Sequence, residues 1–131
     1  QKAAEQGYSL GQDNMGHMYT NGYGVPKDYK LAVHYYRLAA EQGHANAQNN
    51  LGDKYEYGDG IAKDYDQAFY WYKKSAENGN QRGCYNLGKM YLNGRGVAKD
   101  RDKAVYWYKE AAKKGHQKAK NKLRELGETW D

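Results

Sequence analysis

The sequence contains one glycine-rich segment three times, as Gly22-Tyr23-Gly24-Val25-Pro26-Lys27-Asp28, Gly58-Asp59-Gly60-Ile61-Ala62-Lys63-Asp64 and Gly94-Arg95-Gly96-Val97-Ala98-Lys99-Asp100. Successive copies begin 36 residues apart, with no insertion or deletion between them. A fixed period of roughly 20 to 50 residues is typical of proteins built from stacked repeats. The segment therefore predicts a repeat array.

The segment has the chemistry of a connection between two helices. Its paired glycines permit positive φ where one helix ends. Asp28, Asp64 and Asp100 follow at the N-cap position of the next helix. At Asp64, the later Gln67 could also close a reciprocal capping box. A phosphate-binding loop is the alternative interpretation, but it would need a third glycine and a preceding strand.

Apolar spacing predicts two helices in each repeat. In the second repeat, Ala47, Leu51 and Tyr55 share one face of a first helix over about 45–57. A second helix over about 64–78 carries apolar residues at the i, i+3, i+4, i+7 and i+8 positions from Ala68.

Small and aromatic residues recur in register. Gly16, Gly52 and Gly88 lie inside the first helices, where glycine costs about 1 kcal/mol relative to alanine. We expect the second helix to pack there so closely that a Cβ would clash. The second helices carry Tyr36, Tyr72 and Tyr108, whose rings we expect to be buried while their hydroxyls reach polar partners.

The predicted organisation is one repeat array over residues 1–131. Its parts are residues 1–3 as the tail of a preceding repeat, 4–39, 40–75 and 76–111 as three repeats, and 112–131 as a C-terminal capping helix. The first residues match the close of later repeats, so we expect an excerpt of a longer protein with any signal peptide upstream. A periplasmic, secreted or cytoplasmic location all stay open.

Composition narrows the class of protein. The net charge of +5 comes mainly from the C-terminal part, since residues 76–111 carry seven bases and four acids and residues 112–131 six and three. No apolar run approaches the ~18 residues of a membrane span, so we expect a soluble chain. The single cysteine, Cys84, excludes an intramolecular disulfide and a cysteine-based metal site.

The recurring motifs Ala-x-x-x-Leu-Gly-x-x-Tyr, Gly-x-Gly-Val-x-x-Asp and Lys-Ala-x-x-Trp-Tyr-x-x-Ala-Ala-x-x-Gly resemble the Sel-1-like repeat, a relative of the tetratricopeptide repeat. The resemblance covers essentially the whole chain, with departures at Gly11, Met15, Tyr35 and Gly83. It implies an all-α fold, a right-handed α-solenoid of stacked antiparallel helix pairs whose first helices line a concave face. It also implies an adaptor or scaffold for protein complexes.

Differences between the repeats indicate where a partner binds. Positions on the concave face, on the side of the first helices opposite Ala47, Leu51 and Tyr55, change in charge and size, so we expect them to be free of packing and to bind a protein or peptide. They are Asp13, His17, Asn46, Asn49, Asp53, Tyr57, Arg82, Tyr85, Lys89, Asn93 and Asn121. Asn14, Asn50 and Asn86 are identical in three repeats, and a structural ladder between helices is favoured over a peptide clamp.

Two other functional classes fit parts of the sequence. The basic end and the many tyrosines suit a nucleic-acid-binding helical repeat, but basic residues do not recur at one position per repeat. A few relatives of the resembled family bind or hydrolyse β-lactams, which would suggest a cell-wall ligand binder or hydrolase. Neither Ser9 nor Ser75 begins a Ser-x-x-Lys motif, and the four histidines lack a metal-ligand spacing. We therefore expect no catalysis, no cofactor, no metal and no small-molecule substrate.

Overall fold

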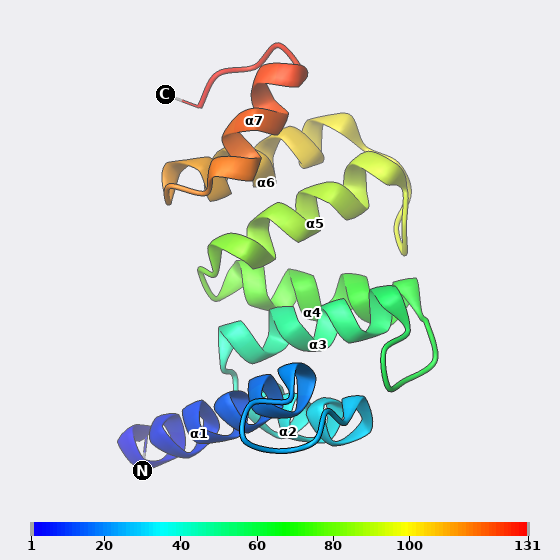
Figure 1. Cartoon of the computed structure of the whole chain (residues 1–131). Coiled ribbons are helices and arrows are strands. Elements are labelled where there is room, and N and C mark those ends of the chain that lie inside the picture. Colours follow the sequence, from blue (N-terminus) through cyan, green and yellow to red (C-terminus); the bar gives the residue numbers. More distant parts are fainter. Residues whose placement is uncertain (1, 131) are drawn as a thin grey trace.

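The computed structural model describes the backbone of residues 2–130 and the side chains of residues 10–130. Residues 2–130 form seven α-helices, which are α1 (Lys2–Asn21), α2 (Tyr29–Glu41), α3 (Ala45–Tyr57), α4 (Tyr65–Glu77), α5 (Gln81–Asn93), α6 (Arg101–Lys113) and α7 (Gln117–Glu125). Consecutive helices pair as hairpins, which stack from the N-terminal to the C-terminal end (Figure 1). The chain is thus an all-α solenoid, and α3 and α4 lie within one residue of their predicted ends.

The recurring glycine segments are the turns inside the hairpins. In the second repeat, Gly58 ends α3 with a left-handed backbone at φ 71°. The Asp64 carboxylate then caps α4 by accepting a hydrogen bond from the Gln67 backbone N–H at 3.1 Å. The Asp64 N–H itself donates to the Tyr55 carbonyl at 2.9 Å. That donor is therefore already used, and the reciprocal capping box expected at Asp64 does not form.

The second glycine of a turn contacts the preceding repeat. A Cβ on Gly60 would lie 2.5 Å from the carbonyl carbon and oxygen of Tyr29, at the start of α2. A Cβ on Gly96 would clash with the Tyr65 carbonyl in the same way. Both glycines also have positive φ, 80° and 69°. Each turn thereby fixes its repeat against the second helix of the repeat before it.

The glycines inside the first helices make the close contact that their register predicts. The pairs are Gly16–Tyr36, Gly52–Tyr72 and Gly88–Tyr108, in which a Cβ on the glycine would lie 2.5, 2.7 and 2.9 Å from the tyrosine ring. All three rings are buried. The two helices of each hairpin therefore approach to a separation that no larger residue allows at these positions.

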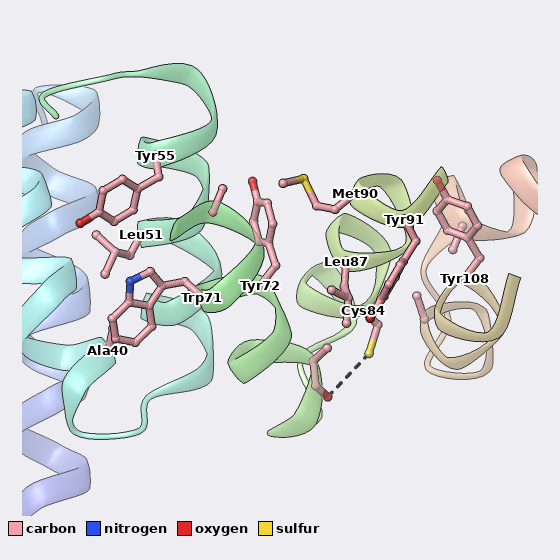
Figure 2. Packing of buried hydrophobic residues seen from close by; sticks show 14 of the residues in the cluster. Ala40, Leu51, Tyr55, Trp71, Tyr72, Cys84, Leu87, Met90, Tyr91 and Tyr108 are labelled. Carbon is pink, nitrogen blue, oxygen red and sulfur yellow. Dashed lines mark hydrogen bonds between the residues drawn. The ribbon is translucent and has the colours of Figure 1, made fainter. Parts of the chain in front are cut away.

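One apolar core continues from repeat to repeat. Figure 2 shows its central part, where the second repeat supplies Leu51, Tyr55, Trp71 and Tyr72 and the third supplies Cys84, Leu87, Met90, Tyr91 and Tyr108. Cys84 takes the place of Gln48 of the second repeat. The Gln48 amide donates to the Ala40 carbonyl at 3.1 Å, whereas the Cys84 thiol lies 3.9 Å from the equivalent Ala76 carbonyl.

The buried tyrosine hydroxyls were expected to find polar partners, and two of the three do. The Tyr36 hydroxyl lies 3.1 Å from His17 Nδ1, and the Tyr72 hydroxyl lies 2.5 Å from Asp53 Oδ1. The Tyr108 hydroxyl is buried and has no hydrogen-bond partner within the part of the chain whose side chains are described. The expectation is therefore wrong for Tyr108.

The two ends of the stack differ. Ala119 and Leu123 of α7 are fully buried against α6, and the Arg124 guanidinium lies 5.3 Å from the Trp130 ring. At the other end, α1 runs without interruption through Gly7, although the sequence there resembles the close of a second helix. Glycine in a helix costs only about 1 kcal/mol, so a helix can continue through it. No helix within residues 2–130 combines the length and apolar character that crossing a bilayer requires.

Candidate functional site

The first helices α1, α3, α5 and α7 carry all eleven residues predicted to bind a partner, which together we call the first-helix face. Their exposure divides them into three groups. Asn46, Tyr57, Arg82, Asn93 and Asn121 are exposed; His17, Asp53, Tyr85 and Lys89 are half-buried; Asp13 and Asn49 are buried.

Asp13 and Asn49 were expected to be free of packing, and this is wrong. Asp13 is 3% exposed and accepts a hydrogen bond from Asn50 Nδ2 at 3.2 Å. Asn49 is 1% exposed and accepts one from Asn86 Nδ2 at 2.7 Å. A carboxylate and an amide oxygen accept from the same donor, so this position varies in sequence while its structural task stays the same.

The same two bonds account for the recurring asparagines. Asn50 links α3 to α1, where its Nδ2 also lies 3.3 Å from His17 Nε2, and Asn86 links α5 to α3. Asn50 is buried and Asn86 half-buried, whereas Asn14 is exposed. The predicted ladder is therefore present at Asn50 and Asn86.

Six of the predicted residues line a single hollow of about 340 Å³ between α3, α5 and the start of α7, which we call the repeat–cap pocket. Its lining consists of Asn49, Asp53, Tyr57, Arg82, Tyr85, Asn86, Lys89, His116 and Lys118. His116 was not among the residues predicted to bind a partner. Its place directly after a helix-ending glycine, at the start of the next first helix, is the signal that could have placed it here.

The remaining predicted residues lie elsewhere on the face. A second hollow of about 220 Å³ is lined by His17, Thr20, Asn21, Tyr36, Asn50, Asp53 and Lys54. Asp53 therefore borders both hollows. Asp13 is beneath the second one, with its carboxylate 3.5 Å from His17 Nε2. Asn46, Asn93 and Asn121 line neither of these two hollows.

Asp53 belongs to a buried polar cluster beneath the repeat–cap pocket. The Tyr72 hydroxyl lies 2.5 Å from Asp53 Oδ1 and 2.7 Å from Glu56 Oε1, and it has only one proton to donate. Arg95 pairs with Glu56 at 3.1 Å. Burial raises the pKa of Asp53, and the nearby Glu56 charge raises it further. The cluster therefore favours a proton on Asp53.

The other wall of the pocket is aromatic. The rings of Tyr85 and His116 stack with centroids 4.8 Å apart and an interplanar angle of 28°. His116 also caps α7, because its Nδ1 accepts from the Ala119 backbone N–H at 3.3 Å. Burial lowers the pKa of His116, and the Lys118 and Arg82 charges lower it further. Since Nδ1 is an acceptor, the neutral ring carries its proton on Nε2.

The described residues offer little that could perform chemistry. Ser75 is fully buried and donates to the Ala45 carbonyl at 2.8 Å, and the side chain of Ser9 lies outside the described residues. Burial raises the pKa of the Cys84 thiol to about 11. Within residues 10–130, whose side chains are described, no three His, Cys, Asp or Glu residues are grouped as metal ligands would be.

Comparison with known proteins gives one family. Residues 1–8, 9–44, 45–80 and 81–116 match the Sel1 repeat, with the same period as the glycine segments. No curated protein matches the sequence. These matches cover most of the chain, so the repeats alone are enough to assign the family.

Three solved structures are similar to this chain. A protective antigen of uropathogenic Escherichia coli with an SLR fold, c5321, is 40% identical with a TM-score of 0.86; the match covers 92% of this chain but only 26% of that protein. A Sel1 repeat protein from Oxalobacter formigenes is 39% identical with a TM-score of 0.82, covering 93% and 92% of the two chains. Helicobacter pylori cysteine rich protein B is 27% identical with a TM-score of 0.75, covering 93% of each. This chain belongs to the Sel1 repeat family.

Proposed function

We propose that the chain is a non-catalytic scaffold that binds a partner protein on its first-helix face, centred on the repeat–cap pocket. One observation carries the proposal: the pocket gathers Tyr57, Arg82, Lys89 and Lys118, which vary between the repeats and, among the described side chains, make no hydrogen bond or ion pair that joins the repeats. Positions identical between repeats, such as Gly52 and Tyr72, are used to join helices. The residues left over are available to a partner.

The pocket offers the contacts that protein interfaces use most. Tyr57 is 56% exposed at its edge, and Tyr85 forms part of its wall. Aromatic residues and arginine supply a large share of binding energy at interfaces because they bury much area and also make polar contacts. Arg82 and Lys118 are both exposed at the same hollow. An adjacent aromatic and charged surface of this kind supports protein recognition.

Site-specific photo-crosslinking tests the proposal. A benzoylphenylalanine replaces Tyr57 or, as a matched control, Tyr106 on α6, since both tyrosines are 56% exposed. Each variant of the full protein is expressed in the cells that make it and irradiated. We expect a discrete protein adduct from position 57 and none from position 106. Equal labelling at both positions, or no adduct at position 57, would contradict the proposal.

A further inference from the structure

We propose that the repeat–cap pocket receives an acidic segment of the partner, whose aspartate or glutamate carboxylates face Arg82, Lys89 and Lys118. This inference rests on the proposed function, because it gives the chemistry of the partner bound at the same pocket. It follows from the three cations that line the hollow, from the neutral His116 ring beside them, and from the hydrogen bonds that hold the Asp53 carboxyl.

Three cationic side chains from two helices converge on the pocket. Arg82 and Lys89 are two turns apart on the same side of α5, and Lys118 comes from α7. Among the residues with described side chains, none of the three forms an ion pair, whereas Arg95 and Arg101 elsewhere each pair with a glutamate. The three cations outnumber the one carboxyl of the lining, Asp53, and an excess of cations in a hollow creates a positive potential that attracts anions.

The His116 ring lines the pocket, and its pKa is sensitive to the same positive charges. After burial, the charges of Lys118 and Arg82 are the causes that lower its pKa. Its Nδ1 is already used by the Ala119 N–H, so the neutral ring presents Nε2–H as a donor. A neutral donor beside three cations suits a carboxylate.

The carboxyl of the pocket opposes an acidic ligand only weakly. Asp53 is the one lining residue with a carboxyl group, and that group bonds to Tyr72 at 2.5 Å, in the core beneath the pocket. The hydroxyl of Tyr72 also lies 2.7 Å from Glu56, so the Asp53 side chain belongs to the buried cluster more than to the surface. The positive charge of the lining is therefore not cancelled.

The distribution of charge favours a peptide over a nucleic acid. A single strand of nucleic acid carries a phosphate at every nucleotide and is bound along a continuous cationic groove. Here the cations are confined to one hollow of about 340 Å³, and the neighbouring hollow is lined by one lysine, Lys54, and by Asp53. A hollow of this size suits a few side chains. The stacked pair Tyr85–His116 beside it provides an apolar surface for the same segment.

Fluorescence anisotropy tests the inference with three probes. They are a short, end-blocked, fluorescein-labelled peptide of alternating glutamate and alanine, its glutamine counterpart, and an oligothymidylate of the same charge as the glutamate peptide. The protein is the full chain. We expect the glutamate peptide to bind, the glutamine peptide not to bind, and added salt to weaken the binding. No binding of the glutamate peptide, or tighter binding of the oligothymidylate, would overturn the inference.

A matched pair of variants locates the binding. The variant R82Q/K118Q removes two cations of the pocket, and K30Q/K73Q removes two exposed lysines of α2 and α4 that do not line it. Both lower the net charge equally. We expect the pocket variant to lose about tenfold in affinity for the glutamate peptide and the control to change by less than about twofold. An equal loss in both would show only an effect of net charge and would contradict the inference.

The two proposals fail in different ways. If R82Q/K118Q abolishes binding of the glutamate peptide but leaves the adduct from position 57 unchanged, the scaffold function stands and the acidic partner is wrong. If position 57 gives no adduct in the protein that keeps Arg82 and Lys118, the scaffold function itself is wrong. Loss of both peptide binding and the adduct in R82Q/K118Q, with retention in K30Q/K73Q, supports both.

Discussion

Gly52 and Tyr72 lie in such close contact that a Cβ on the glycine would be 2.7 Å from two carbons of the tyrosine ring. The ring cannot move aside easily, because it is fully buried and its hydroxyl is hydrogen-bonded to Asp53. The contact therefore fixes the distance between α3 and α4. It also explains why a residue that weakens a helix recurs at this position.

We predict that Gly52→Ala destabilises the protein, although alanine is the better helix former by about 1 kcal/mol. Overpacking of a tight core costs about 1–3 kcal/mol, which exceeds that gain. The control is Gly11→Ala on α1, where a Cβ would meet nothing within 4 Å and the variant should be as stable as the original or more so. Urea unfolding followed by circular dichroism measures both. A stable Gly52→Ala protein would contradict the close contact.

Removing the tyrosine hydroxyls should have opposite effects in two repeats. Tyr72→Phe leaves buried acceptors on Asp53 and Glu56 without their donor, which we expect to lower the free energy of unfolding by about 1–3 kcal/mol. Tyr108→Phe removes a buried hydroxyl that has no partner among the described side chains, and stability should stay the same or rise. Urea midpoints of the two variants decide the matter. Equal losses would mean that the hydroxyl of Tyr108 is also satisfied.

The asparagine ladder predicts a gradient along the stack. Asn86→Ala leaves the buried Asn49 oxygen without its donor, so we expect a loss of about 1–3 kcal/mol. Asn14→Ala changes an exposed side chain and should stay within about 0.5 kcal/mol of the original. Thermal unfolding of both variants measures the difference. A stability loss of the same size in both would show that the bond to Asn49 is not what Asn86 contributes.

The fold could be predicted because its causes are local and repeat. The turn glycines, the capping aspartates and the in-register Gly52 each have one local structural role. Each role recurs in all three repeats, so the sequence shows it three times. The 36-residue period then sets which helices are neighbours. Period and turn chemistry together specify the stack without any knowledge of long-range contacts.

The candidate site was harder to predict, because variation between repeats has two causes. At Arg82 and Tyr57 a residue varies because packing does not involve it. At Asn49 and Asp13 it varies because the asparagine donor of the next repeat accepts either oxygen. Helical periodicity cannot distinguish the exposed residues from the buried acceptors, because both kinds lie on the same side of the helix. The contribution of His116 depends on how α7 meets α5, which no single repeat encodes.

The buried carboxyl of Asp53 predicts a measurable dependence on pH. Burial raises its pKa above the ordinary 3.8, so the folded protein binds this proton more tightly than the unfolded chain. The stabilising contribution of the proton is complete below about pH 3.8 and is lost as the pH rises through the folded-state value. Asparagine resembles the protonated acid. Asp53→Asn should therefore gain stability relative to the original protein as the pH rises from 4 to 7.

Urea midpoints of both proteins at pH 4 and pH 7 check this expectation, with Asp66→Asn on the exposed side of α4 as the control for net charge. The gain at pH 7 belongs to Asp53→Asn alone if burial and the nearby Glu56 charge raise the pKa of the Asp53 carboxyl. Should Asp53→Asn instead lower the midpoint more at pH 7 than at pH 4, the charged carboxylate is what the cluster needs. The single proton of the Tyr72 hydroxyl would then be donated to Asp53, and Glu56 would depend on Arg95 for its partner.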